Sequence, residues 1–197
     1  MKSINVTGTA RTATGKKASR EIRKAGSVPC NLYGEAKGEN GLPQALSFST
    51  TQEELRKLVY SPDIYSVNLT IDGKEYKAIM KELQFHPVTD KLLHVDFYEI
   101  TETKPIVMEV PIKLNGLAEG VKAGGKLAAS VRKLKVRAPY TSIPERLDID
   151  VTNLGLGKTI KVGELSFEGL ELVTSPSVVV CQVKMTRSAM SAAAKSE

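Results

Sequence analysis

The sequence of 197 residues is long enough for one large or two small domains, and its 41% hydrophobic and 25% charged content is ordinary for a globular protein. The formal net charge is +6, aromatic residues make up only 5% of the chain and Trp is absent, so an aromatic-walled cofactor pocket is not expected. There is no secretory pattern at the start and no run of about 18 apolar residues, so we expect a cytoplasmic protein that does not cross a membrane.

The positive charge is concentrated in the first 34 residues. This segment holds seven of the 28 Lys and Arg residues but only one of the 22 acidic residues, so it carries the whole net charge of +6. In residues 35–197 the bases and the acids balance. A local excess of this kind favours a polyanionic partner, although a basic helix that is merely solvated would have the same composition.

Residues 1–100 are expected to form a mainly β domain with two short helices. The strand-like runs are 4–12, 28–33, 46–48, 64–71, 74–83 and 91–100. One helix is predicted over 17–25, ending at Gly26, and a second one carries Leu55, Leu58 and Val59. A capping box at Thr50–Glu53 is expected to open the second helix. Asp72-Gly73 predicts a two-residue hairpin, His86–Asp90 predicts a turn, and residues 35–41 predict a polar loop.

The first helix is predicted to be basic on one side. Lys16, Arg20 and Arg23 fall at helical spacing on one face, with Lys24 beside them. We expect the apolar residues Ala18, Ile22 and Ala25 to point toward a core. A row of Arg and Lys side chains is suited to phosphate groups, and Arg can also bind a guanine edge through two hydrogen bonds.

The last strand of this domain is predicted to present a polar face. Its residues Leu93, Val95 and Phe97 are expected to face the core, while His94, Asp96 and Tyr98 face outward. An imidazole and a carboxylate on one face can recognise base edges or sugar hydroxyls. The alternative is that His94 and Asp96 form a structural hydrogen-bonded pair.

A second, β-rich domain is expected over residues 101–186. The polar, proline-bearing segment Thr101–Pro105 is predicted to be the seam between the two domains. Beyond it, strand-like runs interrupted by Gly and Pro occur at 106–114, 131–138, 147–151, 159–162 and 178–185. Residues 187–197 are small and polar and are expected to form a disordered tail.

The sequence does not predict a catalytic or metal site. Gly15-Lys16 lacks the upstream glycine and the following Ser or Thr of a phosphate-binding loop, and no G-x-S-x-G elbow accompanies the serines. A metal site made from His86, His94 and Asp96 is conceivable but disfavoured, since zinc sites use tighter groups of His and Cys. Cys30 and Cys181 fit neither a disulfide framework nor a metal knuckle, so we expect reduced thiols, no cofactor and no small-molecule substrate.

Three blocks of residues carry a resemblance to a known family. They are Arg11-x-x-x-Gly15-Lys16-x-x-Ser19-Arg20-x-x-Arg23-x-x-Gly26-x-Val28-Pro29-x-x-x-Tyr33-Gly34, then Lys81-Glu82-Leu83-Gln84-x-His86-Pro87-Val88, and then His94-Val95-Asp96-Phe97. With these blocks in this order, the chain resembles the bacterial large-subunit ribosomal proteins that bind 5S ribosomal RNA. Within that family it is most similar to the long two-domain form called general stress protein CTC.

The resemblance implies a small N-terminal β-barrel that docks in the minor groove of an irregular internal loop of 5S RNA. The positions that it places at the RNA are Arg11, Lys16, Ser19, Arg20, Arg23, Tyr33, Gln84, His94 and Asp96, with Lys81 as a further candidate. The chain departs from the family at Cys30 and Asn31, where small or branched apolar residues are usual, so the packing of that strand is open. Phe85 stands where a basic residue is frequent, which removes one phosphate contact.

The function implied is that of a non-enzymatic constituent of the large ribosomal subunit, monomeric when free, that helps to seat 5S RNA in the central protuberance. The main alternative is a stress-linked RNA-binding chaperone or adaptor that acts off the ribosome, and an enzyme with an accessory RNA-binding barrel is more distant. For residues 101–186 the resemblance implies less. There, Arg132, Lys133, Lys135 and Arg137 are expected to form a solvated face rather than a second RNA contact.

Overall fold

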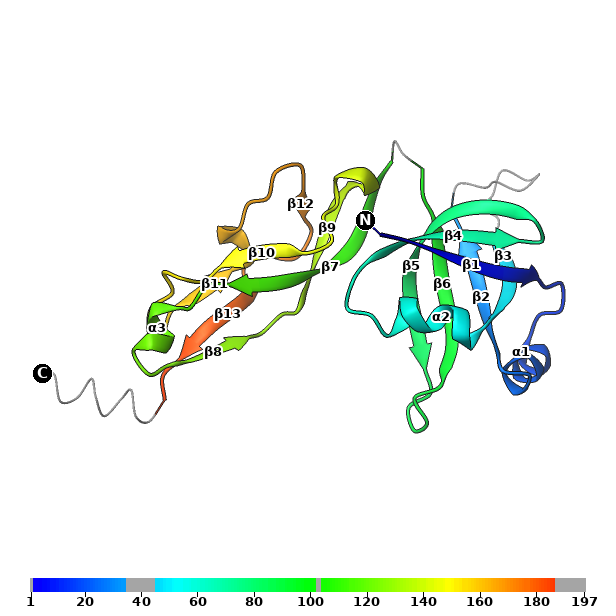
Figure 1. Cartoon of the computed structure of the whole chain (residues 1–197), viewed down its shortest axis with the longest axis horizontal. Helices are drawn as coiled ribbons and strands as arrows, with labels where there is room; N and C mark the ends of the chain where they lie inside the picture. Colours follow the sequence, from blue (N-terminus) through cyan, green and yellow to red (C-terminus); the bar gives the residue numbers. More distant parts are fainter. Residues whose placement is uncertain (1, 35–44, 102–103, 187–197) are drawn as a thin grey trace, which may run out of the picture. The chain divides into compact units, whose positions relative to one another are not determined.

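The computed structural model describes residues 2–34, 45–101 and 104–186 and divides into two compact units, residues 1–104 and 105–197 (Figure 1). Both units are built mainly from strands: the first is a six-stranded closed barrel with two short helices, and the second contains two small sheets. The expected fold class, a small N-terminal β-barrel followed by a β-rich domain, is confirmed. The predicted loop over 35–41 and the predicted tail over 187–197 lie outside the described residues.

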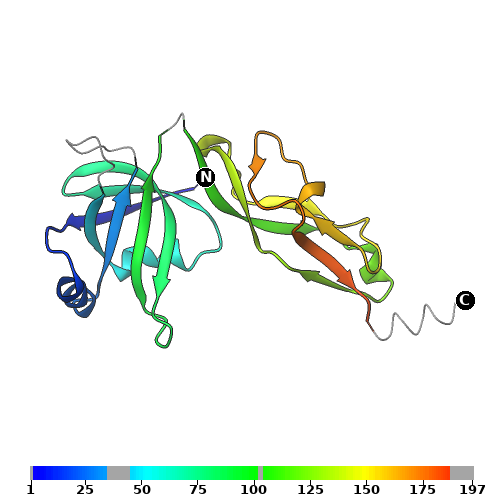
Figure 2. The ribbon, with the colours of Figure 1, turned by 180° about the vertical axis from the view of Figure 1, so that it is seen from behind.

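The barrel closes in the strand order β1-β3-β2-β6-β5-β4, and Figure 2 shows it from behind. Its strands are β1 (Lys2–Ala10), β2 (Ser27–Tyr33), β3 (Leu46–Thr51), β4 (Tyr65–Ile71), β5 (Lys74–Phe85) and β6 (Leu92–Glu99). Strand β1 completes the ring by pairing parallel to β4 and antiparallel to β3. Because every strand has two neighbours, the lateral spacing of side chains on the outer wall is fixed by backbone hydrogen bonds.

The hairpin between β4 and β5 turns at the predicted dipeptide. Asp72 has φ 47° and Gly73 has φ 83°, so both central residues lie in the left-handed region that a type I′ turn requires. This geometry matches the right-handed twist of the flanking strands, which explains why two residues suffice. The predicted turn after β5 is also present, with the His86 N–H donating to the Lys91 carbonyl at 2.8 Å.

The barrel interior is filled by aliphatic side chains around Phe48 and Phe97, whose ring centroids lie 5.8 Å apart. Val95 and Phe97 face this core as expected, but Leu93 does not, and Leu92 occupies the core instead. The register explains the error: Gln84 pairs with His94 and Phe85 pairs with Leu92, so β6 has an extra residue at Leu93. A bulge of this kind reverses the in–out alternation on one side of it.

Two expectations about the helices need correction. Helix α1 (Lys16–Lys24) contains no fully buried residue: Ala18 and Ile22 are half-buried, as the predicted apolar side requires, but Ala25 is exposed, and the helix lies on the outside of the barrel. Helix α2 (Gln52–Val59) has no side-chain cap, because β3 continues through Thr51 and the helix therefore begins one residue late. The carboxylate now at the third helical position, Glu54, accepts from the Thr50 hydroxyl at 2.8 Å and from the Thr7 N–H at 3.0 Å.

The second unit contains sheets in the orders β10-β7-β9-β12 and β11-β13-β8. Its elements are β7 (Pro105–Asn115), α3 (Glu119–Lys122), β8 (Lys126–Ala129), β9 (Lys133–Pro139), a 3-10 turn (Tyr140–Ser142), β10 (Leu147–Asp150), β11 (Thr159–Lys161), a second 3-10 turn (Val162–Glu164), β12 (Glu171–Leu172) and β13 (Val179–Lys184). Strands β8 and β12 were not among the predicted runs. In the described part of the chain, no helix combines the length and the apolar character needed to span a membrane.

Candidate nucleic-acid interface

The outer wall of the barrel carries four polar side chains in one line across four strands. In the strand register, Ser47 of β3 is paired with Asn31 of β2, Asn31 with Asp96 of β6, and Asp96 with Glu82 of β5. We call these four residues the polar row. Neighbouring strands are separated by about 4.8 Å, so adjacent members of the row are within reach of one planar ligand group.

Arg11 is attached to one end of the polar row. It follows β1, and its N–H donates to the Ser47 carbonyl at 2.9 Å. The guanidinium donates through Nη2 to Asn31 Oδ1 at 3.5 Å, and the Ser47 hydroxyl donates to the same oxygen at 3.0 Å. The Arg11 Nε atom is buried without a hydrogen-bond partner among the described residues, so one strong donor at this end of the row is unsatisfied.

His94 and Asp96 lie side by side on β6, with 3.5 Å between His94 Nδ1 and Asp96 Oδ1. Burial lowers the pKa of His94 from its usual value, and the charges of Arg11 and Arg23 lower it further, while Asp96 acts in the opposite direction. The imidazole is therefore uncharged at neutral pH and offers one donor and one acceptor. This separation is compatible with the alternative of a structural pair, and both side chains remain partly accessible, at 17% and 23%.

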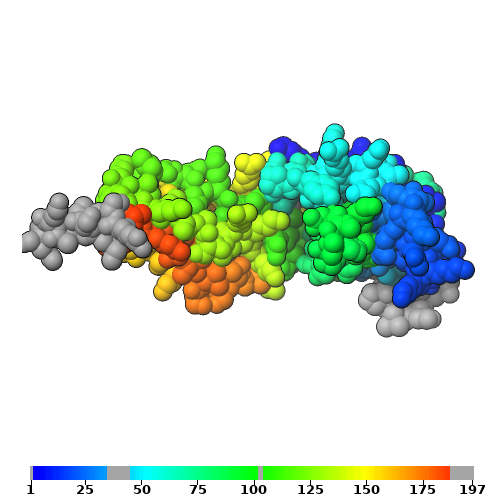
Figure 3. Space-filling model, turned by 90° about the horizontal axis from the view of Figure 1, so that it is seen from below, coloured from blue at the N-terminus to red at the C-terminus, as the bar shows by residue number. Residues whose placement is uncertain are grey.

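Helix α1 is attached to the same wall by Arg23, whose Nε donates to the Leu93 carbonyl at 3.0 Å. Leu93 is the bulged residue, so its carbonyl is available to a side chain. The bases Lys16 and Arg20 are exposed on the helix, and Ser19 is half-buried near its start. In Figure 3 the blue surface that includes α1 adjoins the green surface of the β5–β6 hairpin. The bulge, which the sequence did not predict, therefore places the basic helix beside the polar row.

Two residues next to the polar row are aromatic. Tyr33 on β2 is paired with Tyr98 on β6, and their rings meet edge-to-face with centroids 5.8 Å apart. Burial raises the pKa of the Tyr33 hydroxyl, and the negative charges of Asp96 and Glu82 raise it further. The phenol therefore stays protonated and can donate a hydrogen bond from the edge of the row.

The structure places the predicted site residues in two groups. The first group lies on or beside the polar row and contains Arg11, Arg23, Tyr33, Gln84, His94 and Asp96. The second group, Lys16, Ser19 and Arg20, is on α1. Lys81, the further candidate, is exposed at a bulge of β5, between Met80 and Glu82.

Three members of the polar row, Asn31, Ser47 and Glu82, were not among the predicted site residues. Asn31 and Ser47 alternate with apolar neighbours along their strands, so the pattern already indicated that these two face outward, whereas Glu82 follows the charged Lys81 and shows no such alternation. What the sequence could not indicate was the register that aligns them. That register depends on pairings between strands far apart in the chain.

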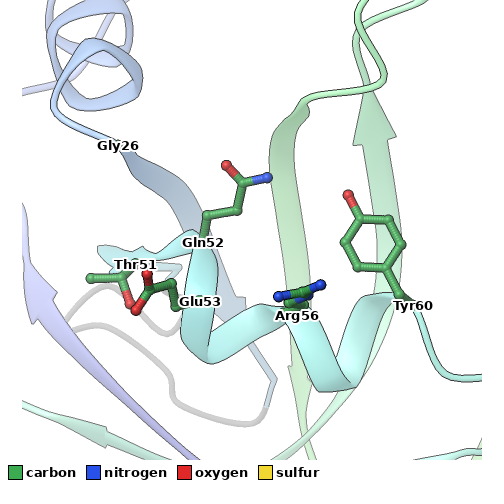
Figure 4. Close-up of a pocket in the computed structure, with 6 residues that line it drawn as sticks. All are labelled: Gly26, Thr51, Gln52, Glu53, Arg56 and Tyr60. Carbon is green, nitrogen blue, oxygen red and sulfur yellow. The ribbon is translucent and has the colours of Figure 1, made fainter.

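A separate hollow of about 750 Å³ lies beside α2 and is lined by Gly26, Thr51, Gln52, Glu53, Arg56 and Tyr60 (Figure 4). Gln52, Arg56 and Tyr60 project from one side of the helix. Tyr60 is 57% exposed, and its ring centroid lies 6.4 Å from that of Phe85. With one base and one acid, the hollow has no net charge to attract a polyanion.

No set of three His, Cys, Asp or Glu side chains within the described ranges is arranged to hold a metal ion. The Nδ1 atom of His86 accepts from the N–H groups of Val88 and Thr89, at 3.3 and 3.2 Å. One ring nitrogen of this histidine therefore stabilises the turn after β5. The thiol of Cys30 is buried in the barrel, which raises its pKa to about 12 and makes it unreactive.

The basic strand of the second unit has acidic neighbours. On β9 the exposed residues Lys133, Lys135 and Arg137 alternate with buried apolar ones, as predicted. Lys135 lies 3.9 Å from Glu109 on β7, and Arg137 lies 3.4 Å from Glu171 on β12. Both acids occupy the directly paired position on the neighbouring strand. This charge balance is what a solvated face requires, and it weakens any attraction to phosphate.

Comparison with known proteins gives the same division of the chain. Residues 6–97 match the ribosomal L25p family, and residues 105–187 match the C-terminal domain of ribosomal protein TL5. A protein of Phocaeicola vulgatus is 66% identical over 194 residues, covering 98% of each chain. Proteins of Bacteroides thetaiotaomicron and Porphyromonas gingivalis are 59% and 55% identical, covering 98% and 100% of each chain. All three are called large ribosomal subunit protein bL25.

Proposed function

This chain belongs to the ribosomal L25p family of large-subunit ribosomal proteins, and we propose that its barrel binds 5S ribosomal RNA and helps to seat it in the central protuberance. The relatives are ribosomal structural proteins, so the expectation of a protein that is not an enzyme is confirmed. The proposed RNA-binding domain is residues 1–100, followed by the β-rich domain 101–186. The free protein is proposed to be a monomer that joins the ribosome in the cytoplasm.

The observation that carries the proposal is the position of α1 beside the polar row. A basic helix supplies attraction to phosphate, and the Arg23 bond to β6 holds it next to side chains that can form directed hydrogen bonds. The minor groove of an RNA helix is wide and shallow, and it exposes base edges and 2′-hydroxyls. A rigid barrel wall with short polar side chains matches such a groove better than a single protruding helix does.

The residues take different roles in this proposal. Lys16, Arg20 and Ser19 on α1 bind phosphates and set the register of the protein on the RNA. Arg11, Tyr33 and Gln84 flank the polar row and donate to base edges or sugars. His94 and Asp96 provide the acceptors, which are useful only against a base amino group or a hydroxyl, because a carboxylate repels phosphate.

The binding of the full-length chain to 5S RNA over a range of salt concentrations tests the proposal. If about four to six phosphates are contacted, the logarithm of the affinity falls with the logarithm of salt with a slope of about −3 to −5. An unrelated RNA hairpin of equal length serves as the control and should bind more weakly at every salt concentration. Affinity that does not change with salt, or equal affinity for both RNAs, contradicts the proposal.

A second measurement separates action on the ribosome from action off it. In a sucrose gradient of cell extract at high salt, the protein should sediment with the large subunit. Sedimentation only with free RNA or small complexes would favour the alternative of an RNA chaperone or adaptor off the ribosome.

A further inference from the structure

We propose that Asn31 is a specificity-determining residue: its amide NH₂ group and the carboxylate of Asp96 form a donor–acceptor pair that recognises the minor-groove edge of one guanine. The inference rests on the proposed function, since it concerns the RNA that the barrel binds. It assigns a base-reading role to the position where this chain carries a polar residue in place of the apolar residue expected there.

The orientation of the Asn31 amide is determined by its neighbours. A guanidinium can only donate, so the Asn31 atom that faces Arg11 Nη2 must be the oxygen. The Ser47 hydroxyl donates to the same oxygen at 3.0 Å. Both lone pairs of the oxygen are thus in use, and the NH₂ group makes no hydrogen bond to the described part of the chain. Asn31 is half-buried on the outer wall, so this NH₂ group is available to a ligand.

The acceptor lies directly beside this donor. Asn31 and Asp96 are paired residues of the parallel strands β2 and β6, and their side chains leave the same face of the barrel. One oxygen of Asp96 lies 3.5 Å from Nδ1 of the His94 ring, and the carboxylate is partly exposed to a ligand. The wall therefore presents a donor and an acceptor side by side at the spacing of one strand pair.

Guanine is the base that complements such a pair in a minor groove. Its amino group N2 is the donor that distinguishes it there, and its N3 atom is an acceptor, whereas the minor-groove edges of adenine, uracil and cytosine offer acceptors only. A carboxylate facing an acceptor-only edge would be repelled. We therefore assign the N2 amino group to Asp96 and the N3 atom to Asn31.

Modified bases separate these two contacts. In inosine the N2 amino group is absent, and in 3-deazaguanosine carbon replaces N3 while N2 is kept. Each guanine of the 5S RNA internal loop is replaced singly by inosine to find positions that matter for the full-length protein. At one position, inosine should weaken binding about five- to tenfold, as expected for losing half of a two-point contact. 3-deazaguanosine at that same position should have a similar effect.

Variants of Asn31 then test the assignment. Asn31→Asp keeps an acceptor for Arg11 and Ser47 but removes the donor, and Asn31→Val removes both while suiting a strand. In either variant, 3-deazaguanosine at the identified position should change the affinity less than twofold. Asn68→Asp is the matched control: Asn68 is exposed on β4, where it donates to Asn5 at 3.0 Å, and the substitution adds the same charge. This control should retain the full loss caused by 3-deazaguanosine.

The outcomes distinguish this inference from the proposed function. If the unaltered protein does not bind unmodified 5S RNA, the proposed function is wrong. If it binds, but 3-deazaguanosine weakens the unaltered protein and both folded Asn31 variants equally, then Asn31 only holds Arg11 in place and this inference is overturned. An inosine scan without any sensitive position in a protein that binds overturns it as well. Thermal melting of each variant shows whether it is folded.

Discussion

Replacing Arg23 with Ala should loosen helix α1 without unfolding the barrel. The helix has nine residues and no buried side chain, and isolated helices shorter than about 12–15 residues are marginal in water. Its attachment therefore depends on a few contacts, of which the hydrogen bond from Arg23 Nε to the Leu93 carbonyl at 3.0 Å is the best defined. That contact is specific to one side chain, so its removal can be compared with a neighbouring substitution.

The expected change in hydrogen exchange follows from the free energy that one hydrogen bond contributes. A protein hydrogen bond contributes about 1 kcal/mol net, which corresponds to about fivefold in an opening equilibrium. Hydrogen exchange of the α1 amides, such as the Ala25 N–H that donates to the Glu21 carbonyl at 3.0 Å, should accelerate about fivefold in Arg23→Ala. Amides in β4 and β5 should exchange at unchanged rates.

Arg20→Ala provides the control, because Arg20 is on the same helix and carries the same charge. Its side chain is exposed and makes no hydrogen bond or ion pair within the described residues. Both variants should lose one charge of attraction to RNA, but only Arg23→Ala should change the exchange of α1. Equal protection of α1 in the two variants would refute the reasoning that the bulge carbonyl holds the helix.

Two further predictions concern the barrel itself. Phe97→Ala should lower the free energy of unfolding by about 3–5 kcal/mol in urea titrations followed by circular dichroism, because the ring is fully buried against Phe48. Phe85→Ala, at a ring that is 40% exposed, should cost less than half as much, and similar costs would contradict the assigned core. Acidification below pH 6.5 should also destabilise the barrel, because the lowered pKa of His94 means that the unfolded chain takes up this proton first. His94→Gln should remove this part of the pH dependence between pH 7.5 and 5.5, and an unchanged profile would show that His94 does not cause it.

Local chemistry made much of the fold predictable. The left-handed pair Asp72-Gly73 marks its hairpin without help from the rest of the chain, and the alternation along β9 places Leu134 and Val136 inside. Bulges could not be predicted in this way, because a bulge is defined by the pairing of two strands and not by the sequence of one. The extra residue at Leu93 depends on the pairing of β5 with β6, so the alternation alone assigned the wrong leucine to the core.

The sequence predicted which types of residue form the candidate site, but not how residues from different strands are aligned in it. His94 and Asp96 lie two residues apart on one strand, so their proximity follows from the sequence. The alignment of Asn31 with Asp96 follows instead from a parallel pairing between strands separated by more than fifty residues. Periodicity contains no information about such a register. The same holds for Arg11, whose contact with Asn31 depends on the β1–β3 and β2–β3 pairings.

If the barrel binds RNA as proposed, the acids of the polar row make its basic surface selective. Asp96 and Glu82 lower the attraction of this wall to phosphate, which costs affinity for every RNA equally. They regain affinity only where a base amino group or a sugar hydroxyl is brought to them in the right place. An RNA that offers acceptors at that place leaves a carboxylate without a partner, which disfavours that RNA. On this view α1 recruits RNA of any sequence, and the polar row rejects most of it.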